Sequence, residues 1–320
     1  MNYRHLGASG VKVSEISLGS WLTYGGYVAE QNAVDSIHRA FELGINFFDT
    51  ANVYMRGGAE EVVARALKGI DRDDYVLATK VYFPMGAGPN DRGLSRKHIW
   101  EQCHRSLERL GTDYVDLYQC HRPDPDTPLD ETLRALDDLV TQGKVLYVGV
   151  SEWPADLLER ARALQGELGF DPIVSNQPQY SALYRDIERD VIPVSERLGI
   201  GQIVWSPLAQ GVLSGKYRPG DAPPEGSRAA APEQSSGFMR RFMNEQTLSA
   251  VQRLRPIADG LGVSMAQLAL AWVLREDNVS SAIIGASRPE QVEDNVGAAG
   301  VELTQDALRA IDEALAPALA

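Results

Sequence analysis

Four side chains that can carry or release a proton lie at or just after apolar segments typical of strands. Asp49 ends the apolar run 45–48, and Tyr54 follows five residues later. Lys80 comes directly after the segment YVLAT, and His121 comes directly after YVDLYQC. Because parallel strands bring their carboxyl ends to one edge of a sheet, these residues predict a single polar site.

The residue types favour proton donation to an oxygen atom. A tyrosine hydroxyl has a pKa near 10 and is a weak acid at neutral pH, but a neighbouring ammonium group favours the phenolate. Lys80 can supply this charge to Tyr54, and Asp49 can pair with Lys80 and hold it in place. His121 can donate a hydrogen bond to the same oxygen. Together they suit a reaction in which negative charge develops on oxygen.

Each of the four residues also has a structural explanation when it is taken alone. Asp49 before Thr50 could cap a turn or a helix, and Tyr54 could be a packing residue. Lys80 could extend from a strand end into water, and His121 could be a hydrogen-bonded loop histidine. The presence of all four at one predicted edge favours a functional site.

The order of the predicted elements is that of an α/β barrel. Eight apolar segments are typical of strands, at 16–20, 45–49, 75–80, 114–121, 145–151, 173–176, 203–206 and 281–285. Helical patterns follow most of them, at 33–43, 60–67, 96–110, 129–142, 154–168, 186–198 and 264–275. Continuous apolar strands separated by helices indicate parallel pairing. The sequence therefore predicts an α/β fold, a (β/α)8 TIM barrel, with its active site at the carboxyl ends of the strands.

Further segments extend this barrel without a second domain. A small hairpin is predicted around Gly7 and Gly10, and an extra C-terminal helix at 304–315. No shift in composition divides the chain, so residues 1–320 are predicted to form one domain. The stretch 217–244 is rich in Gly, Pro and Ser and is predicted to be a long loop, of the kind that is usually a functional lid or disordered.

The bulk composition narrows the classes of function. The 320-residue chain is 44% hydrophobic, which suits a sizeable core, and its net charge of −13 argues against nucleic-acid binding. No apolar stretch approaches the roughly 18 residues that span a bilayer, and the start MNYRHLGASG lacks the features of a secretory signal. The two cysteines, Cys103 and Cys120, have no C-x-x-C spacing, so a cytoplasmic location and packed thiols are expected.

No metal site is expected either. The five histidines lack the spacing of metal ligands. The acidic pair Glu60 and Glu61 falls on a helical pattern, and we interpret it as a solvated helix face.

The residues at the predicted edge also carry a family resemblance. The pattern D-T-A-x-x-Y, with T-K and H-R further on, resembles the aldo-keto reductase superfamily, whose catalytic tetrad matches Asp49, Tyr54, Lys80 and His121. The similarity continues through GLSRKHI, SLERLGTDYVD, RPDPDTPLDET, WSPLAQGVLSGKY and IGASRPEQVEDN. These segments resemble the branch that contains the voltage-gated potassium channel β-subunits and their bacterial enzyme relatives. The resemblance runs from about Tyr3 to the last helix.

This resemblance implies NADPH-dependent reduction of aldehydes or ketones to alcohols, with the hydride from nicotinamide and the proton from Tyr54. The resemblance also implies that the NADP(H) cofactor lies extended across the barrel mouth. A Rossmann-type site is not supported, since no G-x-G-x-x-G segment follows a strand. The matching cofactor positions are Ser20, Trp21, Asp49, Ser151, Asn176, Gln177, Trp205, Ser206, Pro207, Leu208, Ser214, Lys216, Arg228, Ser287, Arg288, Gln291, Asp294 and Asn295. Within this set, Ser151, Asn176 and Gln177 would hold the carboxamide, and Trp205 would stack on the nicotinamide ring.

A phosphate site is predicted at the adenosine end of the cofactor. Pro289 suits the first position of a helix, whose amino terminus attracts anions. Lys216, Arg228 and Arg288 could add positive charge there and favour NADPH over NADH. Arg228 and Arg288 could instead be ordinary surface residues.

Three functions remain open from the sequence. The first is a reductase of a small carbonyl substrate, and the second is a cofactor-sensing auxiliary subunit of a membrane protein, like the channel β-subunits. The third is an enzyme of the same fold that oxidises alcohols. The channel subunits have asparagine at the position of His121 and an N-terminal extension, which favours an enzyme here. Membrane insertion is not expected, and a homo-oligomer remains open.

The substrate pocket is predicted to have an aromatic lining. Tyr24, Tyr27, Tyr82, Phe83 and Trp153 fall in the loops expected at the barrel mouth. The resemblance implies small aldehydes, including methylglyoxal-like and sugar-derived compounds.

Overall fold

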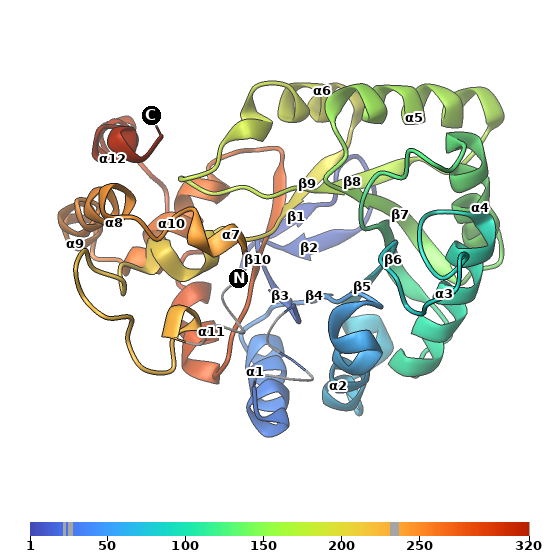
Figure 1. Ribbon diagram of the computed structural model, residues 1–320, viewed down its shortest axis with the longest axis horizontal. Helices are drawn as coiled ribbons and strands as arrows, with labels where there is room; N and C mark the ends of the chain where they lie inside the picture. Colours follow the sequence, from blue (N-terminus) through green and yellow to red (C-terminus); the bar gives the residue numbers. More distant parts are fainter. Residues whose placement is uncertain (22–23, 25–27, 231–236, 320) are drawn as a thin grey trace.

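The computed structural model describes residues 1–21, 24, 28–230 and 237–319 (Figure 1). Its centre is a closed barrel of eight parallel strands in the order β10-β3-β4-β5-β6-β7-β8-β9. Each strand begins and ends within two residues of its predicted bounds, so the predicted (β/α)8 fold is confirmed. The strands are β3 (Ile16–Gly19), β4 (Phe47–Asp49), β5 (Val76–Val81), β6 (Val115–Cys120), β7 (Val145–Ser151), β8 (Ile173–Gln177), β9 (Gly201–Val204) and β10 (Val279–Ile284).

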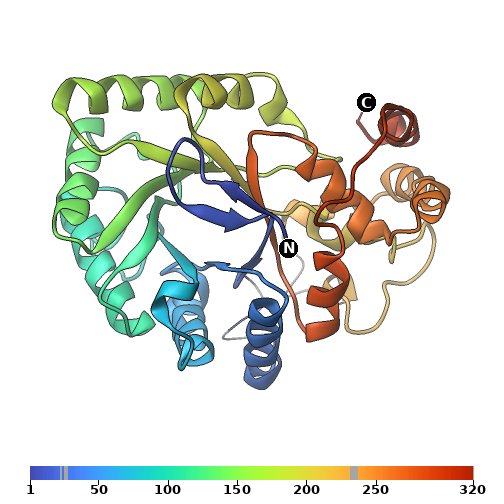
Figure 2. The same cartoon turned by 180° about the vertical axis from the view of Figure 1, so that it is seen from behind.

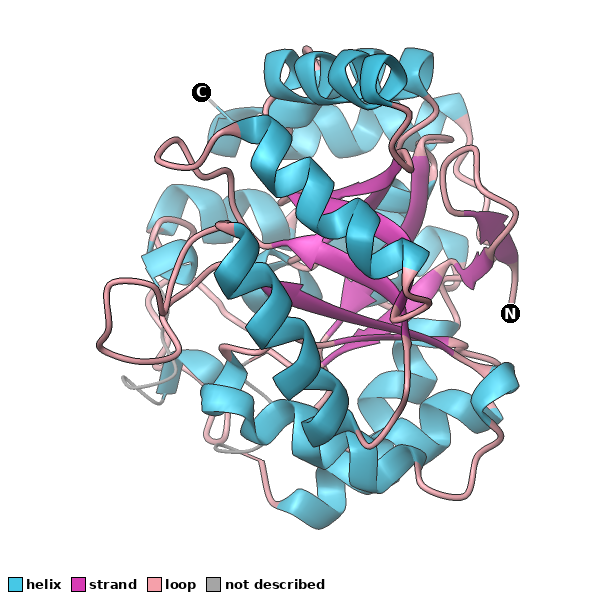
Figure 3. Cartoon of the chain, turned by 90° about the vertical axis from the view of Figure 1, so that its right-hand side faces the viewer, coloured by secondary structure: helices cyan, strands magenta, loops and turns pink. Residues whose placement is uncertain are grey.

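Helices surround the barrel, as Figure 3 shows in cyan around the magenta strands. Seven of them follow the predicted helical patterns: α1 (Glu30–Glu42), α2 (Gly58–Leu67), α3 (Arg96–Leu110), α4 (Leu129–Thr141), α5 (Ala155–Leu168), α6 (Val191–Leu198) and α10 (Met265–Leu274). Their ends have the expected local chemistry. Ser95 caps α3 by accepting the backbone N–H of His98, and Gly111 ends that helix in the left-handed conformation.

The predicted hairpin closes one end of the barrel. It consists of β1 (Tyr3–His5) and β2 (Lys12–Ser14), and in Figure 2 it lies across the barrel opening that faces the viewer. Leu6 and Val13 of the hairpin pack with Phe47 and other barrel residues in one buried cluster. Because this cluster fills the barrel near the start of its strands, the opposite, carboxyl-terminal end is available for a site.

Two differences from the predicted elements concern the second half of the chain. The predicted helix 186–198 is divided into η3 (Asp186–Glu188) and α6, because Asp190 has a non-helical φ of −141°. Helices α8 (Glu245–Gln252) and α9 (Arg255–Leu261) were not predicted.

The predicted loop 217–244 contains two short helical segments, η5 (Arg228–Ala230) and α7 (Gly237–Arg240). Its residues 231–236 lie outside the described part of the chain. Further elements are η2 (Arg72–Asp74), α11 (Pro289–Val296) and the predicted extra C-terminal helix, α12 (Gln305–Leu319).

No single helix of the described residues is long and apolar enough to cross a membrane. One pair of helical segments, Glu245–Leu261 with Met265–Leu274, is together long and apolar enough to span a membrane. The two segments meet at a bend of 88°. The apolar residues of α10 are all buried inside the protein.

Candidate active site

The predicted tetrad comes together at the carboxyl-terminal end of the barrel. Asp49 is the last residue of β4, Lys80 lies near the end of β5, and His121 directly follows β6. Tyr54 begins the short helix η1 (Tyr54–Gly57), in the loop after β4. Hydrogen-bond contacts link the four side chains in the order Asp49, Lys80, Tyr54, His121.

Lys80 is the centre of this cluster and is fully buried. Its Nζ donates to Asp49 Oδ1, to the backbone oxygen of Thr50 at 2.9 Å and to Tyr54 Oη at 3.4 Å. Burial lowers the pKa of Lys80, while the neighbouring Asp49 carboxylate raises it. Because Asp49 pairs with it, the ammonium can remain charged beside the tyrosine hydroxyl.

Tyr54 differs from the sequence expectation in one respect. Burial raises the pKa of its hydroxyl well above 10, the Asp49 carboxylate raises it further, and Arg122 lowers it. The pKa of Tyr54 is thus raised and not lowered as expected, because burial and the Asp49 carboxylate outweigh the nearby positive charge. The hydroxyl therefore keeps its proton at neutral pH, as a proton donor must.

His121 is also buried, with 6% of its surface exposed. Its Nε2 lies 3.4 Å from Tyr54 Oη, and its Nδ1 has no hydrogen-bond partner among the described residues. Burial lowers the pKa of His121 well below 6.5, and the charges of Lys80 and Arg122 lower it further. The ring is therefore neutral at neutral pH and donates through one nitrogen only.

Two buried glutamines complete the surroundings of Asp49. Gln119 Nε2 and Gln177 Nε2 donate to Asp49 Oδ2 at 3.1 and 2.9 Å, and Gln177 Nε2 also donates to Gln119 Oε1 at 3.1 Å. Both carboxylate oxygens are thus hydrogen-bonded. Gln119 was not among the predicted site residues. Its signal was its place two residues before His121, since alternate residues of a strand face the same side.

The residues predicted to hold the carboxamide lie beside this cluster, but their polar groups are partly occupied. Ser151 Oγ donates to the backbone oxygen of Gln177 at 2.8 Å. The Asn176 amide accepts the backbone N–H of Trp153 at 3.3 Å and donates to its oxygen at 3.2 Å. Asn176 therefore joins β8 to the segment after β7.

Trp205, predicted to stack on nicotinamide, lies in an aromatic group at the same end of the barrel. Its ring packs edge-on against Trp21 and Phe238, with ring centres 5.8 and 5.2 Å apart. Its Nε1 donates to Glu152 Oε1 at 2.6 Å. Glu152 directly follows β7 in a left-handed conformation with φ 58°, and it was not among the predicted catalytic or cofactor-binding residues. Its only signal is that place directly after a predicted strand. It holds the indole in position.

Two of the aromatic residues predicted for the pocket lining lie beside the tetrad. The Phe83 ring lies 4.9 Å from that of His121 and 5.2 Å from that of Tyr82, measured between ring centres. Tyr24 and Trp153 are buried, with 1% and 2% exposed, so the prediction that they line an open mouth is wrong. Tyr27 lies outside the described residues.

At the first strand, Ser20 directly follows β3. Its Oγ donates to Thr50 Oγ1 at 2.8 Å, which joins the ends of β3 and β4 beside Asp49. This contact places Ser20 and the following Trp21 at the rim of the same site.

Positive charge gathers after β9, where the phosphate site was predicted. The residues 206–208 lead into η4 (Ala209–Ser214), and Lys216 follows it. Partial desolvation by the surrounding chain lowers the pKa of the exposed Lys216, and the charges of Arg228 and Arg288 lower it further. Neither Lys216 nor Arg228 forms an ion pair with a described residue. Such unpaired, mutually repelling cations fit a phosphate ligand.

Helix α11 supplies the remaining predicted positions. Gln291 Oε1 accepts from the backbone N–H and the Oγ of Ser287, at 2.8 and 3.2 Å. Asp294 accepts from the Oγ of Ser264, the N-cap of α10, at 3.1 Å, and Asn295 is buried. In this structure Gln291 thus fixes the loop before α11, and Asp294 ties the helix to its neighbour.

Glu60 corrects the sequence interpretation of a solvated helix face. It is fully buried. Its Oε2 accepts from Arg109 Nε at 2.5 Å, and its Oε1 accepts from Thr79 Oγ1 at 2.6 Å. Thr79 precedes Lys80, so this network joins the strand of Lys80 to the helix that follows the Tyr54 loop.

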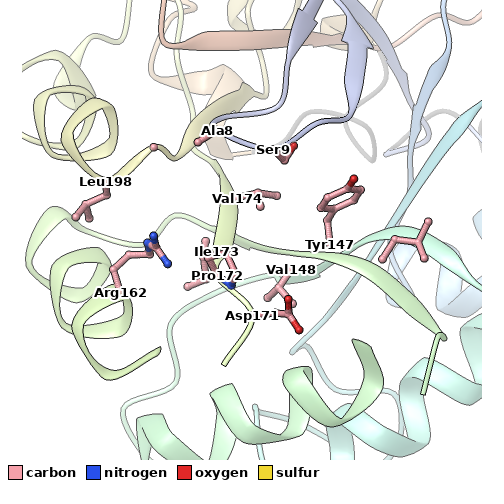
Figure 4. Close-up of a pocket in the computed structure, with 12 residues that line it drawn as sticks. Ala8, Ser9, Tyr147, Val148, Arg162, Asp171, Pro172, Ile173, Val174 and Leu198 are labelled. Carbon is pink, nitrogen blue, oxygen red and sulfur yellow. The ribbon is translucent and has the colours of Figure 1, made fainter. Parts of the chain in front are cut away.

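Two cavities lie at the opposite end of the barrel. One, of about 230 Å³, is lined by Ala8 and Ser9 of the hairpin and by Val148 and Ile173 of the strands (Figure 4). The other, of about 330 Å³, is lined by residues that include Asn46. Both face the amino-terminal part of the barrel, so neither is the site of the tetrad.

Comparison with known proteins agrees with this geometry. A family model described as the aldo/keto reductase family matches residues 15–316. A protein of Schizosaccharomyces pombe is 45% identical over 98% of this chain and 93% of its own length. Proteins of Arabidopsis thaliana and Oryza sativa subsp. japonica are 43% and 42% identical, over 94% of this chain and 92% of their own lengths. All three carry provisional names as voltage-gated potassium channel β-subunits.

The family match covers the barrel and the four residues assembled at its carboxyl-terminal end. The relatives extend that match over almost the whole chain. The chain belongs to the aldo/keto reductase family.

Proposed function

We propose that this protein reduces aldehydes or ketones to alcohols with NADPH. The observation that carries the proposal is the chain of contacts from Asp49 through Lys80 and Tyr54 to His121. It gathers a protonated hydroxyl, an ammonium and an imidazole around one point. Bound NADPH would supply a hydride to the carbonyl carbon, which leaves negative charge on the carbonyl oxygen.

Each residue of the tetrad has one role in this proposal. Tyr54 Oη gives its proton to the carbonyl oxygen, and His121 Nε2 donates a hydrogen bond that orients it. Lys80 stabilises the phenolate left on Tyr54, and Asp49 keeps Lys80 charged. Because Asp49, Lys80 and His121 are buried, these electrostatic interactions are stronger than they are in water.

The proposed cofactor site extends from Trp205 to α11. Trp205 would face the nicotinamide ring, and Lys216, Arg228 and Arg288 would bind phosphate groups. The support is that Lys216 and Arg228 have no ion-pair partner in the described part of the chain. A charge-assisted hydrogen bond contributes about 1.5–3 kcal/mol, so an added 2′-phosphate favours NADPH over NADH.

A second candidate function is that of a cofactor-sensing subunit of a membrane protein. It is supported by the provisional names of the three relatives. A sensor needs cofactor binding alone, whereas this chain also assembles a hydrogen-bonded proton donor. His121 stands where the channel subunits have asparagine, and its Nε2 lies 3.4 Å from Tyr54 Oη. This contact favours the enzyme over the sensor.

Turnover of a carbonyl panel separates these two functions. We expect NADPH absorbance to fall with at least one aldehyde or ketone in the presence of the protein. Cofactor binding without turnover of any carbonyl, together with capture of a membrane channel by the immobilised protein, would favour the sensor instead.

Cofactor preference provides an independent test. Titration of tryptophan fluorescence should give a Kd for NADPH at least about tenfold below that for NADH, the ratio that 1.4 kcal/mol produces. Arg228→Gln should remove most of this difference, because it deletes a cation of the phosphate cluster. The exposed Arg218→Gln is the matched control. Equal affinities for the two cofactors in the unmodified protein would contradict the phosphate site.

A further inference from the structure

Arg122 directly follows His121 and lies at the rim of the candidate active site. Its Nη1 donates to the backbone oxygen of His121 at 2.5 Å and to Ser151 Oγ at 3.4 Å. Its Cζ lies 5.5 Å from the centre of the Phe83 ring, which in turn lies 4.9 Å from the His121 ring. The guanidinium is therefore one aromatic ring away from the groups proposed to act on the carbonyl.

The charge of Arg122 has no carboxylate partner among the described residues. Two other partly buried arginines, by contrast, are paired: Arg109 with Glu60 at 2.5 Å, and Arg72 with Asp116 at 2.5 Å. Only the Nη1 of Arg122 forms hydrogen bonds with described residues, and the side chain is half-buried. Unpaired positive charge at the rim of a cleft attracts anionic ligands.

Two acidic residues of the candidate site, Asp49 and Glu152, are engaged elsewhere. Asp49 is bound to Lys80 and to two glutamines. Glu152 Oε1 accepts from the Trp205 indole at 2.6 Å and from the backbone N–H of Gln179 at 2.7 Å. Neither forms an ion pair with Arg122, so the N–H groups of Arg122 other than those on Nη1 are available to a ligand.

We propose that the substrate is an oxo acid, and that Arg122 binds its carboxylate while Tyr54 and His121 act on its carbonyl oxygen. This inference rests on the proposed reductase function and names its substrate class. A carboxylate fits better than a phosphate monoester, because one guanidinium fork matches one carboxylate with two parallel hydrogen bonds. A dianionic phosphate would leave one charge unbalanced at this position.

Matched acids and esters test the proposal. Succinic semialdehyde is compared with its methyl ester, and 4-carboxybenzaldehyde with methyl 4-formylbenzoate, so that only the carboxylate differs within a pair. We expect kcat/KM to be at least about tenfold higher for the acid of at least one pair. Because loss of the Arg122 charge also acts on Tyr54 and His121, which affects acid and ester alike, the decisive quantity is the ratio of the two kcat/KM values. Arg122→Gln should lower the acid-to-ester ratio of kcat/KM by about 10- to 100-fold.

Two further variants make the comparison specific. Arg122→Lys keeps the charge without the planar fork and should give an intermediate acid preference. Arg92→Gln removes an exposed charge from the loop after β5 that also carries Phe83, and it should keep the full preference. Turnover of the ester by each variant shows that its active site is folded.

The outcomes separate this inference from the function on which it rests. Equal kcat/KM for acids and esters in the unmodified protein overturns the oxo-acid proposal and leaves the reductase intact. Equal slowing of acid and ester by Arg122→Gln also overturns it, because Arg122 would then act through the cofactor or His121. Failure to reduce any of the four compounds, or any other carbonyl, overturns both.

Discussion

At the scale of single residues, the site is defined by which groups stay charged after burial. Asp49 accepts from three side chains, Lys80, Gln119 and Gln177, so its charge is stabilised without water. His121 has no such partner on Nδ1 in the described residues, and it is neutral. The same burial that keeps Tyr54 protonated therefore keeps His121 unprotonated.

This difference makes stability depend on pH through His121. Its pKa in the folded protein lies well below 6.5, the value of an unperturbed histidine. Below pH 6.5 the unfolded chain binds a proton that the folded chain does not, so the free energy of unfolding decreases as pH falls. His121→Asn removes this proton from the unfolded state, and it should reduce the slope by up to about 1.4 kcal/mol per pH unit.

Urea denaturation at a series of pH values between 7 and 5 measures that slope. His98 is also buried, and burial lowers its pKa from 6.5, so it contributes to the same slope. The slope of the unmodified protein is therefore compared with that of the His121→Asn variant and not with zero. Identical slopes for the two proteins would show that His121 titrates normally in the folded state.

At the scale of elements, the loop that carries Tyr54 is held in an uncommon shape. Met55 and Arg56 have positive φ angles of 49° and 53°, and Gly57 has 98°. A Cβ at Gly57 would lie 2.6 Å from the Cδ of Arg109, whose guanidinium pairs with the buried Glu60. The Arg109–Glu60 ion pair thus packs against the loop at Gly57, and we infer that it helps to fix the position of Tyr54.

Removal of one partner should therefore affect both stability and catalysis. Arg109→Met leaves the Glu60 carboxylate buried without a cation, which costs about 3–5 kcal/mol of unfolding free energy. We also expect a lower kcat with an unchanged Kd for NADPH, because Tyr54 is displaced and the phosphate cluster is not. Urea denaturation and steady-state kinetics measure the two effects.

The exposed pair Arg65–Glu30 provides the control for this prediction. Its side chains are 48% and 57% exposed, so Arg65→Met should cost less than about 1 kcal/mol. A similar small loss for Arg109→Met, with unchanged kcat, would mean that the buried pair does not position the loop.

At the scale of the whole molecule, the hairpin and the tetrad occupy opposite ends of one barrel. Gly7 joins the hairpin to the barrel with φ 57°, and a Cβ there would lie 2.4 Å from Val174 O and 2.5 Å from Gly199 O. Only glycine fits so close to these two backbone oxygens, so the packing of the hairpin on the barrel depends on Gly7. The two ends are linked by the strands and not by a shared pocket among the described residues.

Gly7→Ala should therefore lower stability without changing the site. Backbone oxygens cannot yield as a flexible side chain does, and we expect a loss of about 1–3 kcal/mol. The matched control is Gly10→Ala in the same hairpin, where no atom lies within 4 Å of the added Cβ. Thermal unfolding measures the difference in Tm between the two variants. An unchanged Tm for Gly7→Ala would contradict the role of Gly7 in packing the hairpin on the barrel.

Much of this architecture could be predicted because it depends on local pattern. The eight strands are continuous apolar runs, and the tetrad residues are visible where such runs end. What was missed depends on partners distant in sequence. Glu60 is buried because Arg109, 49 residues away, neutralises it, and the Tyr54 pKa is raised by burial that only the closed barrel creates.

The central claim, that Tyr54 donates the proton, is tested most directly by single-turnover oxidation of bound NADPH with a carbonyl that the unmodified protein reduces. Tyr54→Phe should slow this step by about 10²- to 10⁴-fold, the usual contribution of a general acid, while the Kd for NADPH stays unchanged. Tyr82→Phe, next to Phe83 at the same rim, should keep the rate of the unmodified protein. A single-turnover rate for Tyr54→Phe close to that of the unmodified protein would contradict the account.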